Sequence, residues 1–349
     1  MTIRQRPRKI KKRGRSKRIP RRDFRKRKRS IHPGHGQSLL QQKLSDQAAV
    51  SYNQGFDAGY DEAWLKAEQS GTGEIRLKKY EEGYKDGLYD GGEGIVDSIL
   101  PEHIILPEIT VRQLIEAGVE QWRHRFLGLL SATEVNGFIQ NALNKGLPLS
   151  IVRLGDGELL TLAQETAMDA ERIRKEGHFL PYAGVRVPDL EARNQLVDAV
   201  QKADIVGIPK LRLPNFQPLA ITVFKAHGID YRKLRLTQST INYSLYLEGF
   251  VRSMLERRRV LVVGNASPGL AQALSAGGVE VAGSVSPVEG VHDVPRVLGE
   301  ISVRDFDIAL VSAGIPAVMI VQRIASELKK VAIDFGHLAD SMANGEIAL

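Results

Sequence analysis

The segment from residue 149 to residue 158 combines an apolar run with two closely spaced acids. Leu149–Leu154 is mostly apolar and β-branched, which predicts a buried strand. Gly155–Glu158, with the sequence Gly-Asp-Gly-Glu, follows directly. In an extended backbone Asp156 and Glu158 would lie on one face, uncrowded by the glycines. Carboxylates bind Mg²⁺ and Mn²⁺ together with substrate phosphates and water, so a metal site is one interpretation and a solvated turn is the other.

A histidine follows another predicted strand, at residues 331–334. Because the carboxyl ends of parallel strands meet at one edge of a sheet, His337 is expected at the same edge as Asp156 and Glu158. A lone histidine is more often structural than a ligand, but neutral imidazole can complete a carboxylate metal shell or contact a phosphate. We therefore predict a site for Mn²⁺ or Mg²⁺ formed by Asp156, Glu158 and His337.

Two further turns lead from a predicted strand into a predicted helix. In Gly264–Gly269, Ser267 is expected to be the N-cap residue and Pro268 the first helical residue. Ser312–Pro316 is a turn of the same kind. Their backbone N–H groups either bind a phosphate or simply cap a helix, and the pattern does not decide between the two. Neither spacing is that of a P-loop or of the dinucleotide-binding fingerprint, which disfavours an oxidoreductase that uses NAD.

The strands and helices that must position these residues alternate along the chain. Strands are predicted at 149–154, 204–208, 260–264, 279–282, 307–311 and 331–334, and helices near 189–202, 218–227, 240–257, 268–276 and 316–329. Two capping boxes predict earlier helices, one from Thr110 and Gln113 to about residue 127 and one from Ser131 and Glu134 to Gly146. The alternation predicts an α/β fold, with a mainly parallel sheet covered by helices on both faces.

The first 45 residues are predicted to be a disordered basic tail. Residues 1–30 contain 17 Lys and Arg and the single acid Asp23, whereas the other 319 residues contain 32 Lys and Arg and 40 Asp and Glu. Such a tail suits a nucleic-acid backbone, an anionic membrane surface or an acidic partner. Phe24 is its only aromatic residue, so base recognition is disfavoured.

Composition limits the compartment and the class of protein. The sequence has no cysteine and no apolar segment long enough to span a membrane, and no apolar core follows its basic start as in a secretory signal. We expect a cytoplasmic protein whose tail could hold it at the periphery of a membrane or an assembly.

Residues 46–100 contain a short repeat of glycines and aromatic residues. Residues 51–64 and 79–92 each place aromatic or apolar side chains at helical spacing, with glycines beside them. A glycine inside a helix costs about 0.5–1 kcal/mol relative to alanine, so a regular series suggests close helix packing. We predict a helical hairpin that serves packing or oligomerisation, with an aromatic docking face as the alternative.

The region from about residue 140 to 340 resembles the GT-D fold family of glycosyltransferases. The resemblance rests on three short motifs and on their order and separation: Val152-Arg153-Leu154-Gly155-Asp156-Gly157-Glu158-Leu159 with its DxE element, Thr240-Ile241-Asn242-Tyr243-Ser244-Leu245-Tyr246-Leu247-Glu248-Gly249, and Ala332-Ile333-Asp334-Phe335-Gly336-His337. It implies a Rossmann-like catalytic domain, placed at 108–349, that transfers a sugar from a nucleoside-diphosphate donor to an acceptor with a divalent metal. A UDP-sugar is the favoured donor, and the acceptor is a glycan, a glycoprotein or another hydroxyl compound.

Under this resemblance Asp156 and Glu158 are the catalytic residues. They would bind the metal and the donor, or one of them would be the general base for the acceptor. Donor-binding residues are predicted at Arg153, Gly155, Gly157, Asn242, Ser312, Gly314 and His337. Arg153 would face the diphosphate, although its position inside a strand also permits a structural ion pair. The alternative function is a noncatalytic adaptor or nucleic-acid-associated protein that acts through its basic tail.

Overall fold

The computed structural model describes residues 83, 85–87 and 89–349, all of which belong to the unit Tyr60–Leu349. The tail predicted at 1–45 lies outside the described residues, as does most of the hairpin predicted at 46–100. The described end of that region is a π-helical turn, Tyr89–Glu93, followed by helix α3, Gly94–Ile99. In the described part of the chain, no helix combines the length and the hydropathy needed to cross a membrane.

The centre of the fold is a seven-stranded, fully parallel sheet with the strand order β3-β2-β1-β7-β6-β4-β5. The strands are β1 (Leu149–Arg153), β2 (Ile205–Ile208), β3 (Leu236–Gln238), β4 (Arg259–Gly264), β5 (Glu280–Val285), β6 (Ile308–Ser312) and β7 (Val331–Asp334). The six predicted strands are confirmed. The prediction omitted β3, because three residues at a sheet edge are too few to show a periodicity.

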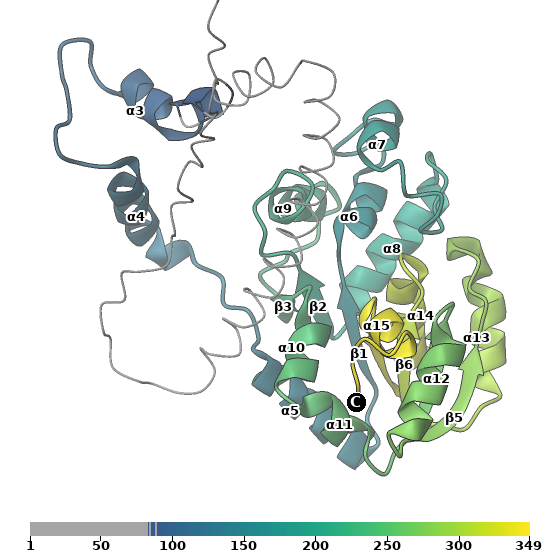
Figure 1. Ribbon diagram of the computed structural model, residues 1–349. Coiled ribbons are helices and arrows are strands. Elements are labelled where there is room, and N and C mark those ends of the chain that lie inside the picture. Colours follow the sequence, from purple (N-terminus) through teal and green to yellow (C-terminus); the bar gives the residue numbers. More distant parts are fainter. Residues whose placement is uncertain (1–82, 84, 88) are drawn as a thin grey trace, which may run out of the picture. The chain divides into compact units, whose positions relative to one another are not determined.

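Helices cover both faces of the sheet, as predicted (Figure 1). The first face carries α6 (Asp156–Ala163), α7 (Ala170–Glu176), α8 (Leu190–Lys202), α9 (Gln217–Ala226), α13 (Val294–Ser302) and α14 (Pro316–Leu328). The second face carries α5 (Ala132–Lys145), α10 (Ile241–Leu247), α11 (Phe250–Leu255), α12 (Ser267–Ala276) and α15 (Leu338–Ala343).

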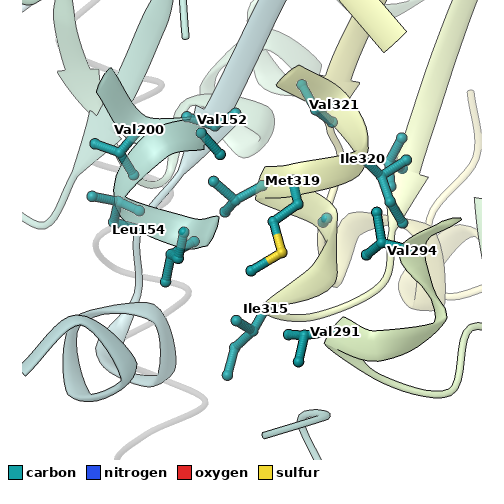
Figure 2. Packing of buried hydrophobic residues seen from close by; sticks show 14 of the residues in the cluster. Val152, Leu154, Val200, Val291, Val294, Ile315, Met319, Ile320 and Val321 are labelled. Atoms are coloured by element: carbon teal, nitrogen blue, oxygen red, sulfur yellow. The ribbon is translucent and has the colours of Figure 1, made fainter. Parts of the chain in front are cut away.

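Successive residues of the central strands enter the two cores alternately. In β1, Ile151 lies in the core of the second face, whereas Val152 and the following Leu154 lie in the core of the first face. Figure 2 shows Val152 and Leu154 near Met319 of α14. Because both faces are buried, these strands are continuous apolar runs, which is typical of parallel sheets.

The two predicted capping boxes are confirmed. Thr110 precedes α4 (Val111–Gln121), and its N–H donates to Gln113 Oε1 at 2.9 Å. Ser131 precedes α5 and donates in the same way to Glu134 Oε2 at 2.8 Å. Gly146 ends α5 in the left-handed conformation, at φ 63°. The predicted end of the first helix near residue 127 is wrong, because α4 stops at Gln121 and a 3₁₀ turn follows.

Two helix predictions after β3 need correction. The single helix predicted at 240–257 is two helices, α10 and α11, because Gly249 between them adopts φ 77°. Ser267 is not an N-cap residue, since α12 already begins there. Its hydroxyl lies 2.7 Å from Ser284 Oγ, and this contact links α12 to β5.

The strand order creates a switch point between β1 and β7. From β1 the chain continues to β2 and β3 on one side, whereas β4 to β7 occupy the other side. In open parallel sheets, ligands bind outside the carboxyl ends of the strands at such a point. The Gly155–Glu158 turn follows β1, and Phe335–His337 follows β7, so both segments lie at this edge.

Candidate functional site

Asp156 and Glu158 lie in the first turn of α6 rather than in extended backbone. Gly155 is the N-cap residue, and its N–H donates to Glu158 Oε2 at 2.7 Å. Asp156 Oδ1 accepts a hydrogen bond from Gly157 N–H at 3.0 Å. Residues two apart in a helix are about 200° apart around its axis, so they do not share a face. The expectation that both carboxylates share one face is therefore wrong, and the reason is that Glu158 caps the helix.

Glu158 is one of two acids in this region whose pKa is raised, the other being Asp334. The residue is half-buried, and loss of solvation by its carboxyl group is the main cause of its raised pKa. This burial, together with the negative charge of Asp334, raises the pKa of Glu158 to about 7, against the opposing effect of the Gly155 hydrogen bond and of Arg153. A carboxyl group with such a pKa exchanges protons near neutral pH, as a general acid or base must.

Arg153, at the end of β1, makes hydrogen bonds within the protein through all three of its guanidinium nitrogens. Its Nε donates to the Asp334 backbone oxygen at 3.0 Å, and its Nη2 lies 2.9 Å from Asp334 Oδ1. Its Nη1 donates to Ser239 O at 2.9 Å and to Asn242 Oδ1 at 3.2 Å. These four hydrogen bonds join the last residues of β1 and β7 to Ser239, which follows β3, and to Asn242 of α10. They favour the structural ion pair over the interpretation in which Arg153 faces a diphosphate.

Two glycines, Gly207 and Gly336, lack the side-chain atoms that would otherwise fill the space occupied by Arg153. A Cβ atom on Gly207 of β2 would lie 3.0 Å from Gln238 O and 3.3 Å from Arg153 Cγ. A Cβ atom on Gly336 would overlap the guanidinium group, and Gly336 also adopts φ 53°. The backbone therefore approaches Arg153 at positions where a larger residue would displace it.

The other predicted donor-binding residues differ in how their polar groups are used. Asn242 is buried, and its Nδ2 donates to Phe335 O at 2.8 Å while its Oδ1 accepts from Arg153, which favours a structural role. The Ser312 hydroxyl donates to Gly336 O at 3.1 Å and joins the ends of β6 and β7. Gly314 is exposed in the turn before α14, with φ 60°.

The structure also tests how well the predicted metal ligands converge. His337 is exposed and immediately precedes α15. Among residues 83, 85–87 and 89–349, no three His, Cys, Asp or Glu side chains lie close enough together to hold a metal ion, so Asp156, Glu158 and His337 do not form a ready-made triad. A site with one carboxylate, completed by donor phosphates and water, still fits these residues, because Mg²⁺ commonly uses one or two carboxylates. Both carboxylates are half-buried, and Asp156 is the better candidate because the raised pKa of Glu158 leaves that carboxyl group partly protonated near neutral pH.

The loop between α7 and α8 packs over this edge of the sheet. Phe179 of this loop and Ile315 both border Gly157, at 3.4 and 3.6 Å from a Cβ placed there. Gly184 packs against Gly290, and its backbone oxygen accepts from Val291 N–H at 3.2 Å. The loop thereby shields the buried side of the first turn of α6 from water.

Sequence reasoning missed several residues near this edge. Lys210 and Arg212 are exposed in the loop that follows β2, the strand next to β1. A basic loop after a predicted strand was the available signal for them. The capping role of Glu158 was also missed, although Gly155 and Glu158 have the spacing of a capping box.

A family model places this architecture among known domains. The model for the GT-D fold-like domain matches residues 130–342. The chain belongs to the GT-D fold-like domain family. The GT-D-like domain contains all three segments of the candidate site. These are the turn after β1, the start of α10 and the turn after β7. Among curated proteins, none matches the chain significantly.

Two solved structures are similar to the GT-D-like domain at low identity. One is the domain of unknown function 1792, described as having a distinct glycosyltransferase fold, with 18% identity and a TM-score of 0.42. The other is a selenomethionine-substituted structure of a domain with the same designation, with 17% identity and a TM-score of 0.41. In both comparisons the match covers 64% of this chain and 85% of the other chain. Because both likenesses are distant, the family assignment rests on the family model.

Proposed function

We propose that the protein is a glycosyltransferase that moves a sugar from a nucleoside-diphosphate donor, favoured to be a UDP-sugar, to a hydroxyl group of an acceptor. The observation that carries the proposal is the family match over residues 130–342, which includes Asp156 and Glu158 at the carboxyl end of β1. The edge between β1 and β7 is where a parallel sheet of this kind binds nucleotides.

The donor diphosphate would lie at the turns that enter α6 and α14. The first N–H groups of a helix have no partners within the helix, and its dipole favours an anion at this end. α14 begins at Pro316, after the turn that contains Gly314. Lys210 and Arg212 add positive charge beyond β2. Stabilising the charge of the leaving diphosphate is the largest demand of the reaction.

Glu158 is assigned as the general base. In the transfer, an acceptor hydroxyl attacks the anomeric carbon, its proton passes to the Glu158 carboxylate, and the bond between that carbon and the diphosphate oxygen breaks with its electron pair leaving on the diphosphate. A pKa near 7 suits this step, because the carboxylate is available as a base and the acid can release its proton again.

Asp156 is assigned to the donor and to the metal. Mn²⁺ or Mg²⁺, when bound, would supply positive charge to the diphosphate. Asp156 would hold it, with His337 contributing only if it turns toward the same site. Arg153 and Asn242 would hold in place the ends of the strands that precede Asp156 and His337.

The experiment is a donor-hydrolysis and transfer screen across nucleotide sugars, with and without Mn²⁺ or Mg²⁺. NAD and DNA at graded salt are included as ligands in thermal-shift measurements. Asp156→Asn and Glu158→Gln should lower the rate of transfer by at least about 10²-fold in a folded protein. Glu300→Gln on α13, whose side chain is 42% exposed, is the matched control. Full transfer by both site variants, or stabilisation by NAD instead of a nucleotide sugar, would contradict the proposal.

The basic tail remains a separate proposal. We propose that residues 1–45 hold the enzyme on an anionic surface or an acidic partner, because their charge is opposite to that of the remaining chain. If only the tail were functional, as in the adaptor hypothesis, tail deletion would remove every activity, and donor turnover by the deleted protein would exclude that hypothesis.

A further inference from the structure

A cavity lies at the carboxyl end of β2, the strand that pairs with β1. Its volume is about 710 Å³, within the usual range for small-molecule sites. Three segments line it: the residues before α5, the end of β2 with the start of α9, and the turn between α9 and β3. Among the lining residues are Arg125, Phe126, Leu127, Ile208, Ile221 and Arg232.

The cavity has apolar walls that solvent can reach. Phe126 is 60% exposed and Leu127 is 42% exposed, although both are large apolar side chains. Two further apolar residues line the same cavity. Ile221 belongs to α9, and Ile208 is the buried last residue of β2. An exposed concave surface of this composition favours a ligand with an apolar or aromatic body.

The charge of the lining is entirely positive. It includes Arg125 and Arg232 and contains no Asp or Glu. Arg232 is ordered by Tyr231, with its guanidinium carbon 4.8 Å from the ring centre. Tyr231 in turn stacks on the buried ring of Phe224, 6.4 Å away between centres. Gln217 marks the N-terminus of α9, whose dipole also favours an anion.

The position of the cavity relates it to the reaction. Gly207, next to Ile208 in β2, pairs with Arg153 in β1, and Asp156 follows β1. Neighbouring strands are about 4.8 Å apart, so a molecule in the cavity would lie next to the donor edge without filling the crevice between β1 and β7. An acceptor must occupy a place of this kind.

Building on the proposed glycosyltransferase function, we infer that this cavity binds the acceptor and that the acceptor is an anion with an apolar or aromatic body. The apolar walls bind the body, and Arg232 with Arg125 binds the anionic group. The acceptor hydroxyl then projects toward the carboxyl end of β1, where Glu158 takes its proton.

The binding part of the inference is tested with two fluorescent probes that differ in charge. 8-Anilinonaphthalene-1-sulfonate is an aromatic anion, and N-phenyl-1-naphthylamine is its uncharged parent. The full chain should bind the anion about tenfold more tightly, because a charged ligand group gains charge-assisted hydrogen bonds from arginine. Arg232→Gln should remove this preference, and Ile221→Trp, which fills the cavity, should weaken both probes. Arg323→Gln on α14 is the arginine control and should change neither. Equal binding of the two probes, or unchanged binding by Ile221→Trp, would overturn the inference.

The acceptor assignment is tested in the presence of the donor. The sulfonate probe should raise the KM for acceptors found in the transfer screen and leave the rate of donor hydrolysis unchanged. Inhibition of hydrolysis to the same extent would assign the cavity to the donor and overturn the inference. If no nucleotide sugar is hydrolysed at all, the proposed function fails, and the probe titrations then still report whether the cavity selects aromatic anions.

Discussion

Arg153 and Asp334 form an ion pair that joins the ends of the neighbouring strands β1 and β7, with 2.9 Å between Nη2 and Oδ1. The side chains are only 17% and 6% exposed. Removing one partner of a buried ion pair leaves the other charge buried without a partner, which costs about 3–5 kcal/mol of unfolding free energy. We therefore expect Arg153→Met to destabilise the protein by about this amount, measured by urea denaturation.

A matched surface pair provides the control for this first prediction. Arg323 and Glu327 of α14 also form an ion pair, but their side chains are 38% and 48% exposed. Arg323→Met should cost at most about 1 kcal/mol. The double change Arg153→Met with Asp334→Leu should recover part of the loss, since no unpaired charge remains. Equal losses for the two arginine variants would show that burial of the Arg153 pair is unimportant.

The pKa of Glu158 predicts how stability depends on pH. Burial and the nearby Asp334 raise it from 4.5 to about 7, so between these values the folded state binds more protons than the unfolded state. The contribution of Glu158 to stability is therefore fully present below pH 4.5, declines as pH rises to about 7 and is lost above it. Glu158→Gln should remove this decline, as measured by denaturation at a series of pH values. A wild-type and a variant curve with the same slope across this window would contradict the assigned pKa.

The same group predicts the pH profile of transfer. As general base, Glu158 must be ionised, so kcat/KM should rise with pH and level off above a pKa near 7 in the free enzyme. Glu158→Asp, which keeps a carboxylate with a shorter side chain, should retain a rising profile at a lower rate, whereas Glu158→Gln should lose it. A flat wild-type profile across this range would exclude Glu158 as the base.

The contrast between β1 and its end illustrates what the sequence could predict. The strand itself was predictable because apolar, β-branched runs reflect burial on both faces. The capping boxes at Thr110 and Ser131 were predictable because they are local hydrogen-bond patterns. The direction of the Arg153 side chain was not, since its partners at Ser239 and Asp334 are 86 and 181 residues away in the chain.

The conformation of the Gly155–Glu158 turn was missed for a different reason. Glycine and aspartate are common in turns, in extended segments and at helix starts, so composition did not separate these states. The signal that decides is the glutamate three residues after the N-cap position. Once α6 begins at Asp156, the two acids must diverge, and only then do separate roles for Asp156 and Glu158 follow.

Gly336 predicts a steric test of the Arg153 arrangement. A Cβ atom at this position would overlap the guanidinium group, and its φ of 53° is unfavourable for other residues. Gly336→Ala should therefore destabilise the protein and lower transfer, because Arg153 must move away from Asp334. Gly299→Ala is the control, since this exposed glycine lies in α13 with open space around it. It should stabilise the helix by about 0.5–1 kcal/mol. Destabilisation of similar size at both positions would mean that the space beside Arg153 is not the cause.

The two roles of Glu158 can be separated by comparing two substitutions. Glutamine and glutamate at the third helical position can both accept the N-cap N–H, here from Gly155, whereas alanine cannot. Glu158→Gln should therefore keep the start of α6 and lose only the base, lowering kcat by about 10²–10⁴ without loss of stability. Glu158→Ala should lose the same activity and also about 1 kcal/mol of unfolding free energy, because the Gly155 N–H loses its partner. Denaturation and transfer rates measured on both variants distinguish the roles. If the glutamine variant were as unstable as the alanine variant, the capping hydrogen bond would not account for the position of Glu158, and the divergence of the two acids would need another cause.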